Sequence, residues 1–185
     1  MFVFQEFIDA IIMTFGIGYI FMNVFKNRPK DVLVDFKSGF NWGNFWFACS
    51  VVVPAIIFHE LAHKFFALSF GMQATFHAHY TFLGLGILLK LMNFGFIFFV
   101  PGFVSILGTG TNLQFAMISF AGPLMHALFW IGSSFALKNL KLDRKKTYYL
   151  LLTKKINGFL FILNMLPIPG IDGFSVYSNL LNAFF

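Results

Sequence analysis

Charged residues are scarce in this chain. Its 185 residues include 13 Lys and Arg and 7 Asp and Glu, so that 11% are charged, whereas 58% are hydrophobic. Soluble domains carry about 25% charged residues, and a globule this poor in charge could not cover itself with polar groups. We therefore expect an integral, multi-pass protein of the cell membrane, with the lipid bilayer as its outer solvent. Its length fits a single domain over residues 1–185.

Cysteine is nearly absent, since Cys49 is the only one. One cysteine cannot form an intramolecular disulfide, and its apolar surroundings predict a small core residue. The formal net charge is +6, but the basic residues stand between apolar runs, as they do beside membrane spans, so we expect no nucleic-acid partner. The first apolar run carries Glu6 and Asp9 near its start, where a signal peptide would have Lys or Arg, and no small-residue cleavage site follows it. This favours a retained first helix.

Long apolar runs divide the chain into candidate membrane spans. A span needs about 20 apolar residues. Such runs lie at residues 2–25, 45–70, 113–137 and 156–185, and the last is broken by two prolines. These runs predict an all-α polytopic membrane protein with about four transmembrane helices.

The stretch between the second and third runs is ambiguous. Residues 73–79 alternate in polarity and predict a short strand. Residues 81–107 are apolar but interrupted by glycines and Pro101, and they could form a helix, a helical hairpin or a re-entrant segment with extended strands. We therefore predict a re-entrant or short β element between the second and third spans.

Two basic stretches, residues 26–37 and 138–155, are expected on the same side of the membrane. The spans 45–70 and 113–137 supply two crossings between them. The stretch 81–107 must then cross the membrane zero times or twice, which favours a re-entrant or hairpin form. The absolute orientation stays open.

The string His59-Glu60-Leu61-Ala62-His63 lies within the second run. On a helix, His59 and His63 share one face, where two imidazoles can hold one zinc ion. Glu60 lies beside the metal without ligating it. As a general base it can take a proton from a zinc-bound water that attacks a peptide bond, and later pass it to the leaving amine. Such polar groups are costly in a membrane helix, so their presence indicates a functional site.

A catalytic zinc ion usually has three protein ligands. Asp172 is the only carboxylate besides Glu60 within a later apolar run. Pro167 and Pro169 cannot continue helical hydrogen bonding, so they open the backbone before Asp172 and let it turn toward the histidines. The alternative is that Asp172 caps a following helix. We expect one zinc ion per chain, at the centre of the bundle, held by His59, His63 and Asp172.

Asn164 stands eight residues before Asp172 in the same run. Its amide could donate to a substrate carbonyl or to the developing oxyanion. It could instead form a hydrogen bond between helices.

Together the two strings resemble the site-2 protease family, the intramembrane zinc metalloproteases. That family pairs HExxH with a later N-x-x-P-x-P-x-x-D-G string, which residues 164–173 match. Ala121-Gly122-Pro123 also matches, and the resemblance covers about residues 45–175, the expected catalytic core. It implies hydrolysis of transmembrane or membrane-embedded peptides. It also implies zinc held by His59, His63 and Asp172, with Glu60 and Asn164 as catalytic residues.

Two positions depart from the family pattern. His126 stands where many members have Asn, and we favour an interhelical hydrogen bond over a fourth polar group at the metal. Phe174 stands where the family often has a second glycine after Asp172-Gly173.

Helical peptide bonds are shielded by their own hydrogen bonds, so the substrate must present unwound backbone. We expect residues 97–107 to form an extended edge with which it pairs as an added strand.

Two other functions remain open. One is a membrane transport or metal-binding protein that uses His59, His63, His77 and His79 as an ion path. The other is a family member that binds transmembrane helices without cleaving them. The oligomeric state is unknown.

Overall fold

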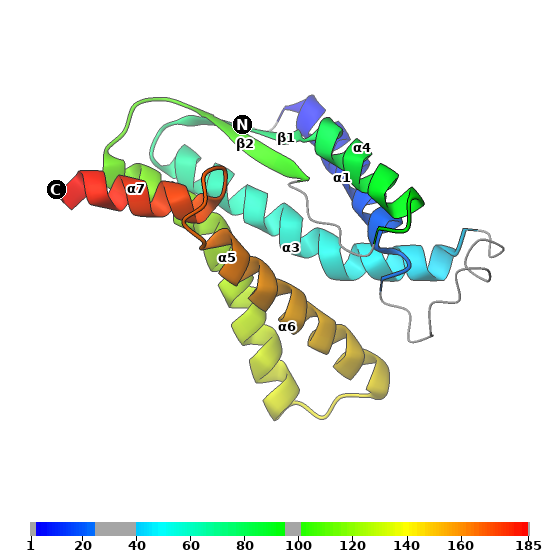
Figure 1. Ribbon diagram of the computed structural model, residues 1–185. Helices are drawn as coiled ribbons and strands as arrows, with labels where there is room; N and C mark the ends of the chain where they lie inside the picture. The colour runs from blue at the N-terminus through cyan, green and yellow to red at the C-terminus, as the bar shows by residue number, and fades with distance from the viewer. Residues whose placement is uncertain (1–2, 25–39, 95–100, 185) are drawn as a thin grey trace.

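A computed structural model describes residues 3–24, 40–94 and 101–184 (Figure 1). The elements in chain order are α1 (Phe4–Phe21), α3 (Trp42–Ser69), β1 (Gln73–Ala78), α4 (Tyr80–Leu91), β2 (Gly102–Leu107), α5 (Asn112–Asn139), α6 (Arg144–Asn164) and α7 (Asp172–Phe184). The expected linker at 26–37 lies outside the described residues.

Three of the described helices, α1, α3 and α5, are long and apolar enough to cross a membrane. They correspond to the first three predicted spans. α3 begins after Asn41, whose side-chain oxygen accepts a hydrogen bond from the Asn44 amide at 2.9 Å. It ends before Gly71, whose φ of 77° suits the left-handed conformation that closes many helices.

The fourth predicted span is not one helix. Residues 144–164 form α6, and Asp172 begins the separate 13-residue α7. The basic stretch 138–155, expected as a loop, lies largely in α6, because the Asp143 carboxylate caps the helix by accepting from the Lys146 amide at 2.7 Å. That hydrogen bond also lowers the pKa of Asp143. Lys145, Lys146 and Lys155 of α6 are exposed.

The ambiguous stretch contains a short helix and a two-stranded antiparallel sheet. β1 and β2 pair with Thr75 opposite Ser105 and His77 opposite Phe103. At 12 residues, α4 is too short to span a bilayer. The strand predicted at residues 73–79 is therefore confirmed, and within 81–107 the described residues form neither a single helix nor a crossing hairpin.

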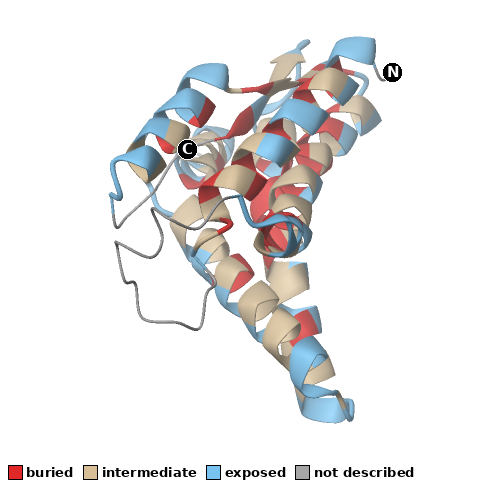
Figure 2. Ribbon diagram, turned by 90° about the vertical axis from the view of Figure 1, so that its right-hand side faces the viewer, coloured by how far each residue is buried: buried red, intermediate tan, exposed pale blue. Residues whose placement is uncertain are grey.

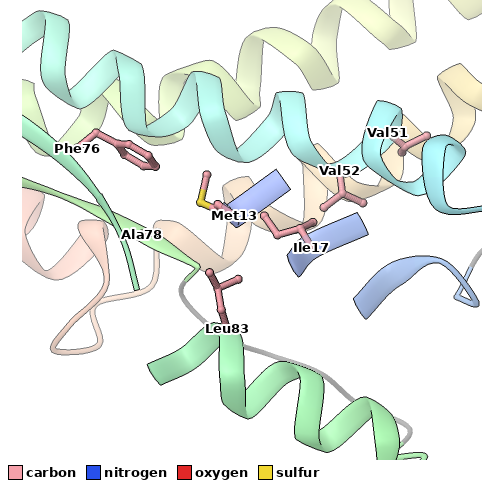
Figure 3. Close-up of a cluster of buried hydrophobic side chains, with 7 residues drawn as sticks. All are labelled: Met13, Ile17, Val51, Val52, Phe76, Ala78 and Leu83. Carbon is pink, nitrogen blue, oxygen red and sulfur yellow. The ribbon is translucent and has the colours of Figure 1, made fainter. Parts of the chain in front are cut away.

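The main core lies where α1, α3, β1 and α4 meet. Figure 3 shows its buried side chains, which are Met13, Ile17, Val51, Val52, Phe76, Ala78 and Leu83. Figure 2 shows buried residues gathered in the upper part of the molecule, whereas the tip of the α5–α6 hairpin at the bottom is exposed. Large apolar side chains such as Phe4, Trp46 and Phe135 are more than half exposed, which fits helices that contact a membrane.

Candidate metal centre

Three potential metal ligands converge from α3 and α7. His59 and His63 lie one helical turn apart on the buried face of α3, and their Nε2 atoms are 3.1 Å apart. The Asp172 Oδ2 atom lies 3.1 Å from His59 Nε2 and 3.4 Å from His63 Nε2. The structure thus brings together two segments that are about a hundred residues apart in the chain.

The break between α6 and α7 positions Asp172. α6 ends at Asn164, and Pro167 and Pro169 prevent its continuation. Gly170 then turns the chain with a φ of 89°, a conformation that favours glycine. Asp172 is the first residue of α7, and its carboxylate lies against both histidines, as a ligand would. Gly173 is needed for space, because a Cβ there would lie 2.6 Å from the Leu166 carbonyl oxygen.

The spacing of these atoms fits a tetrahedral metal site. Zinc bonds of about 2.0–2.1 Å place tetrahedral ligand atoms roughly 3.3–3.4 Å apart, close to the observed 3.1–3.4 Å. Three lone-pair atoms held this closely repel one another unless a cation or a shared proton lies between them. The donor set of two imidazoles and one carboxylate is also one that zinc uses.

A hydrogen bond fixes the ring of His63 for ligation. Its Nδ1 atom lies 2.7 Å from the carbonyl oxygen of Ile118 in α5. A carbonyl oxygen can only accept, so Nδ1 carries the proton. In the neutral ring, Nε2 therefore directs a lone pair at the cluster. This contact ties the ligand helix α3 to α5.

Gly122 allows α5 to approach the two histidines. A Cβ at this position would lie 2.3 Å from His63 Nε2 and 2.7 Å from His59 Nε2. Real Cβ atoms do not tolerate such contacts, so no larger residue fits here without movement. The Ala121-Gly122-Pro123 string is visible in the sequence, but the steric role of Gly122 depends on how closely α5 packs against α3, which the string itself does not indicate.

Glu60 is 7% exposed and shares a cavity of about 230 Å³ with the three candidate ligands. Asn164 lines the same cavity from the end of α6. The strand β2 lines another part of the cavity, through Gly102, Phe103, Val104 and Ile106. The cavity therefore joins both predicted catalytic residues, the candidate ligands and a strand edge, although the chemical roles of these residues stay predictions.

His126 connects helices behind the candidate ligands. Its Nδ1 atom lies 3.0 Å from Asn157 Oδ1 in α6, which is the interhelical hydrogen bond favoured from the sequence. Its ring also packs against His59, with centroids 4.7 Å apart. His77 and His79 instead contact Phe103 at the sheet and do not line the described cavity, which removes support for an ion path through all four histidines.

Comparison with curated proteins finds a relative in the archaeon Methanocaldococcus jannaschii, which is named "Putative zinc metalloprotease". The two proteins are 34% identical over 173 residues, a stretch that covers 91% of this chain and 81% of the relative. No protein-family model and no solved structure matches the chain.

Proposed function

The chain belongs to the zinc metalloprotease family of its archaeal relative, and on that premise we propose that it is an intramembrane endopeptidase. The observation that carries the proposal is one shared cavity. It combines two histidines and an aspartate at metal-ligand spacing, a buried glutamate and a strand edge. The cavity lies beside α3 and α5, two helices that are long and apolar enough to span a bilayer.

In this proposal His59, His63 and Asp172 hold one zinc ion. When bound, zinc supplies Lewis acidity toward a peptide carbonyl and a water molecule. Glu60 accepts the proton of the attacking water at its carboxylate and returns it to the leaving amine. Its burial within α3 keeps bulk water from competing for that proton. Asn164 donates its amide hydrogen to the substrate carbonyl, where negative charge develops.

We further propose that the substrate is a transmembrane peptide that pairs with β2. The sheet has two strands within the described residues, and β2, unlike β1, contributes residues to the lining of the cavity. An unwound substrate segment could add there as a strand and bring its backbone to the metal centre. The expected edge at 97–107 is described only from residue 101 onward.

The proposal is tested with purified protein and a model transmembrane peptide. Glu60→Gln keeps the side-chain shape but removes the base, so we expect zinc content near wild type and cleavage lower by at least about 10²-fold. Asp172→Ala should instead lower zinc content, because it removes a ligand. Full cleavage by Glu60→Gln would refute the mechanism. Zinc binding without cleavage by the wild type would favour a metal-binding or non-cleaving membrane protein.

A further inference from the structure

Two carboxylates of the first membrane helix are almost completely buried. Glu6 is 3% exposed and Asp9 is 1% exposed, although α1 is one of the helices apolar enough to span the bilayer. Ionisable groups are expensive at membrane depth and usually mark a functional role. Neither residue lines the cavity of the metal centre, so the proposed chemistry leaves them unexplained.

Both carboxylates accept hydrogen bonds from the backbone of β1. Glu6 Oε1 accepts from the Phe76 amide at 2.6 Å, and Asp9 Oδ2 accepts from the Ala78 amide at 3.2 Å. Asp9 also accepts from the Tyr80 hydroxyl and from the Gln5 amide. Phe76 and Ala78 are two residues apart, so their N–H groups point to the same side of the strand.

That side is the edge of β1 opposite to β2. The amide of His79 donates to the Pro101 carbonyl at 2.8 Å, and His77 and Thr75 follow the same alternation toward β2. The amides of Phe76 and Ala78 therefore point outward, where a third strand would otherwise pair. Glu6 and Asp9 occupy these donors and close that edge of the sheet.

The same network reaches the helix that carries the histidines. The ammonium group of Lys64 donates to Glu6 Oε1, and Lys64 is 0% exposed. Lys64 follows His63 in the chain. One carboxylate oxygen therefore contacts both β1 and α3, and it links the sheet to the helix that bears two candidate zinc ligands. Figure 1 shows the strands lying alongside α3, with α1 at their right-hand end.

We propose that Glu6 and Asp9 are positioning residues that set the place of the sheet relative to the metal centre. This inference rests on the proposed function. Glu6 and Asp9 close the free edge of β1, so that only the edge of β2 is left for the substrate. They also hold β1 in place, and the position of the sheet determines which substrate bond reaches Glu60. α1 thus takes part in choosing the scissile bond, in addition to crossing the membrane.

The test compares Asp9→Asn and Glu6→Gln with the wild type. Asp143→Asn serves as the control, because it makes the same carboxylate-to-amide change at the exposed cap of α6. Each protein receives the same transmembrane peptide, and the products are mapped by mass spectrometry. We expect unchanged zinc content and a KM raised roughly tenfold, since each variant weakens hydrogen bonds to a charged acceptor.

The decisive readout is the position of the cut. A strand that slips by two residues keeps its side chains on the same faces, so both variants should add cuts two residues from the wild-type bond. A merely structural role would reduce the amount of active protein without moving the cut. If Glu6→Gln fails to fold because Lys64 loses this contact, Asp9→Asn carries the test. Asp9 accepts from neutral amide and hydroxyl donors, and the His77 Nδ1 atom lies farther away, at 3.7 Å.

Hydrogen exchange separates this inference from the proposed function. The amides of Phe76 and Ala78 should exchange faster in both variants than in Asp143→Asn, whether or not any peptide is cleaved. A wild type that cleaves nothing would contradict the proposed protease, while faster exchange would still support the anchoring of β1. Variants that hold zinc, keep slow exchange in β1 and cut the wild-type bond with the wild-type KM would overturn the inference.

Discussion

Gly122 lies where α5 comes closest to the two histidines of α3. The space that its missing side chain leaves is filled by the Nε2 atoms of His59 and His63. One turn earlier in α5, the Ile118 carbonyl accepts the hydrogen bond from His63. One short stretch of α5 therefore both orients a candidate ligand and limits how far the helix can shift.

We predict that Gly122→Ala lowers peptide cleavage by roughly tenfold or more, because overpacking displaces side chains or backbone at a cost of about 1–3 kcal/mol. Zinc content, measured on the same preparation, should also fall. Gly132→Ala is the matched control on the same helix, since a Cβ there meets no atom within 4 Å. Equal activity of the two variants would show that α5 can move away without harm to the site.

At the scale of elements, the two strands use their backbone donors in alternation. The amides of Phe76 and Ala78 point away from β2. The N–H groups of the residues opposite them, Val104 and Gly102, therefore point away from β1. Val104, which lines the cavity, therefore offers its N–H at the edge of β2 away from β1. Ser105, by contrast, faces Thr75 within the sheet, so proline at Ser105 would break the sheet rather than test the edge.

Val104→Pro should reduce cleavage of a transmembrane peptide by about tenfold, since it removes one donor from the substrate-facing edge. Val104→Ala is the control, because it loses the side-chain packing of Val104 but keeps the N–H. The comparison is made on proteins with equal zinc content. If proline and alanine at this position reduce cleavage equally, strand addition at β2 is wrong and the helices become the docking surface.

The sequence predicted elements whose signals are local. The HExxH string, the proline break before Asp172 and the alternation at residues 73–79 each act within a few residues, and the structure has a helix, a break between two helices and a strand at these places. The anchoring of β1 by Glu6 and Asp9 joins residues about 70 positions apart, and the role of Gly122 depends on how closely two helices pack. Such contacts leave no periodic pattern in the chain, so only the three-dimensional structure reveals them.

At the scale of the whole molecule, the amino-terminal halves of α3 and α6 lie together. The Tyr149 hydroxyl donates to the Ser50 carbonyl at 2.7 Å, and the rings of Phe47 and Tyr148 stack with centroids 5.9 Å apart. α4 is too short to cross a bilayer. The start of α3 and the α5–α6 loop should therefore face the same side of the membrane, as the parity of the basic stretches requires.

Single cysteines test this topology. Gly43→Cys and Lys141→Cys should react with a membrane-impermeant maleimide in the same sealed vesicles, and Thr109→Cys should react only in vesicles of the opposite orientation. All three positions are exposed, whereas Cys49 is 7% exposed and should give little background. Labelling of Gly43→Cys and Lys141→Cys from opposite sides would rule out two crossings between them.

The buried carboxylates of α1 also impose an order on the biogenesis of the protein. During synthesis, Glu6 and Asp9 enter the bilayer long before Lys64 and β1 have been made. An acidic residue can cost up to about 2.5–3.5 kcal/mol on insertion scales when it stands at the middle of a helix. Glu6 and Asp9 lie in the first two turns of α1, so their cost falls below that limit, but their donors from Lys64 and β1 arrive only when the later chain has been made. We therefore expect the packing of α1 and the folding of the sheet to be completed together, after α1 has entered the membrane.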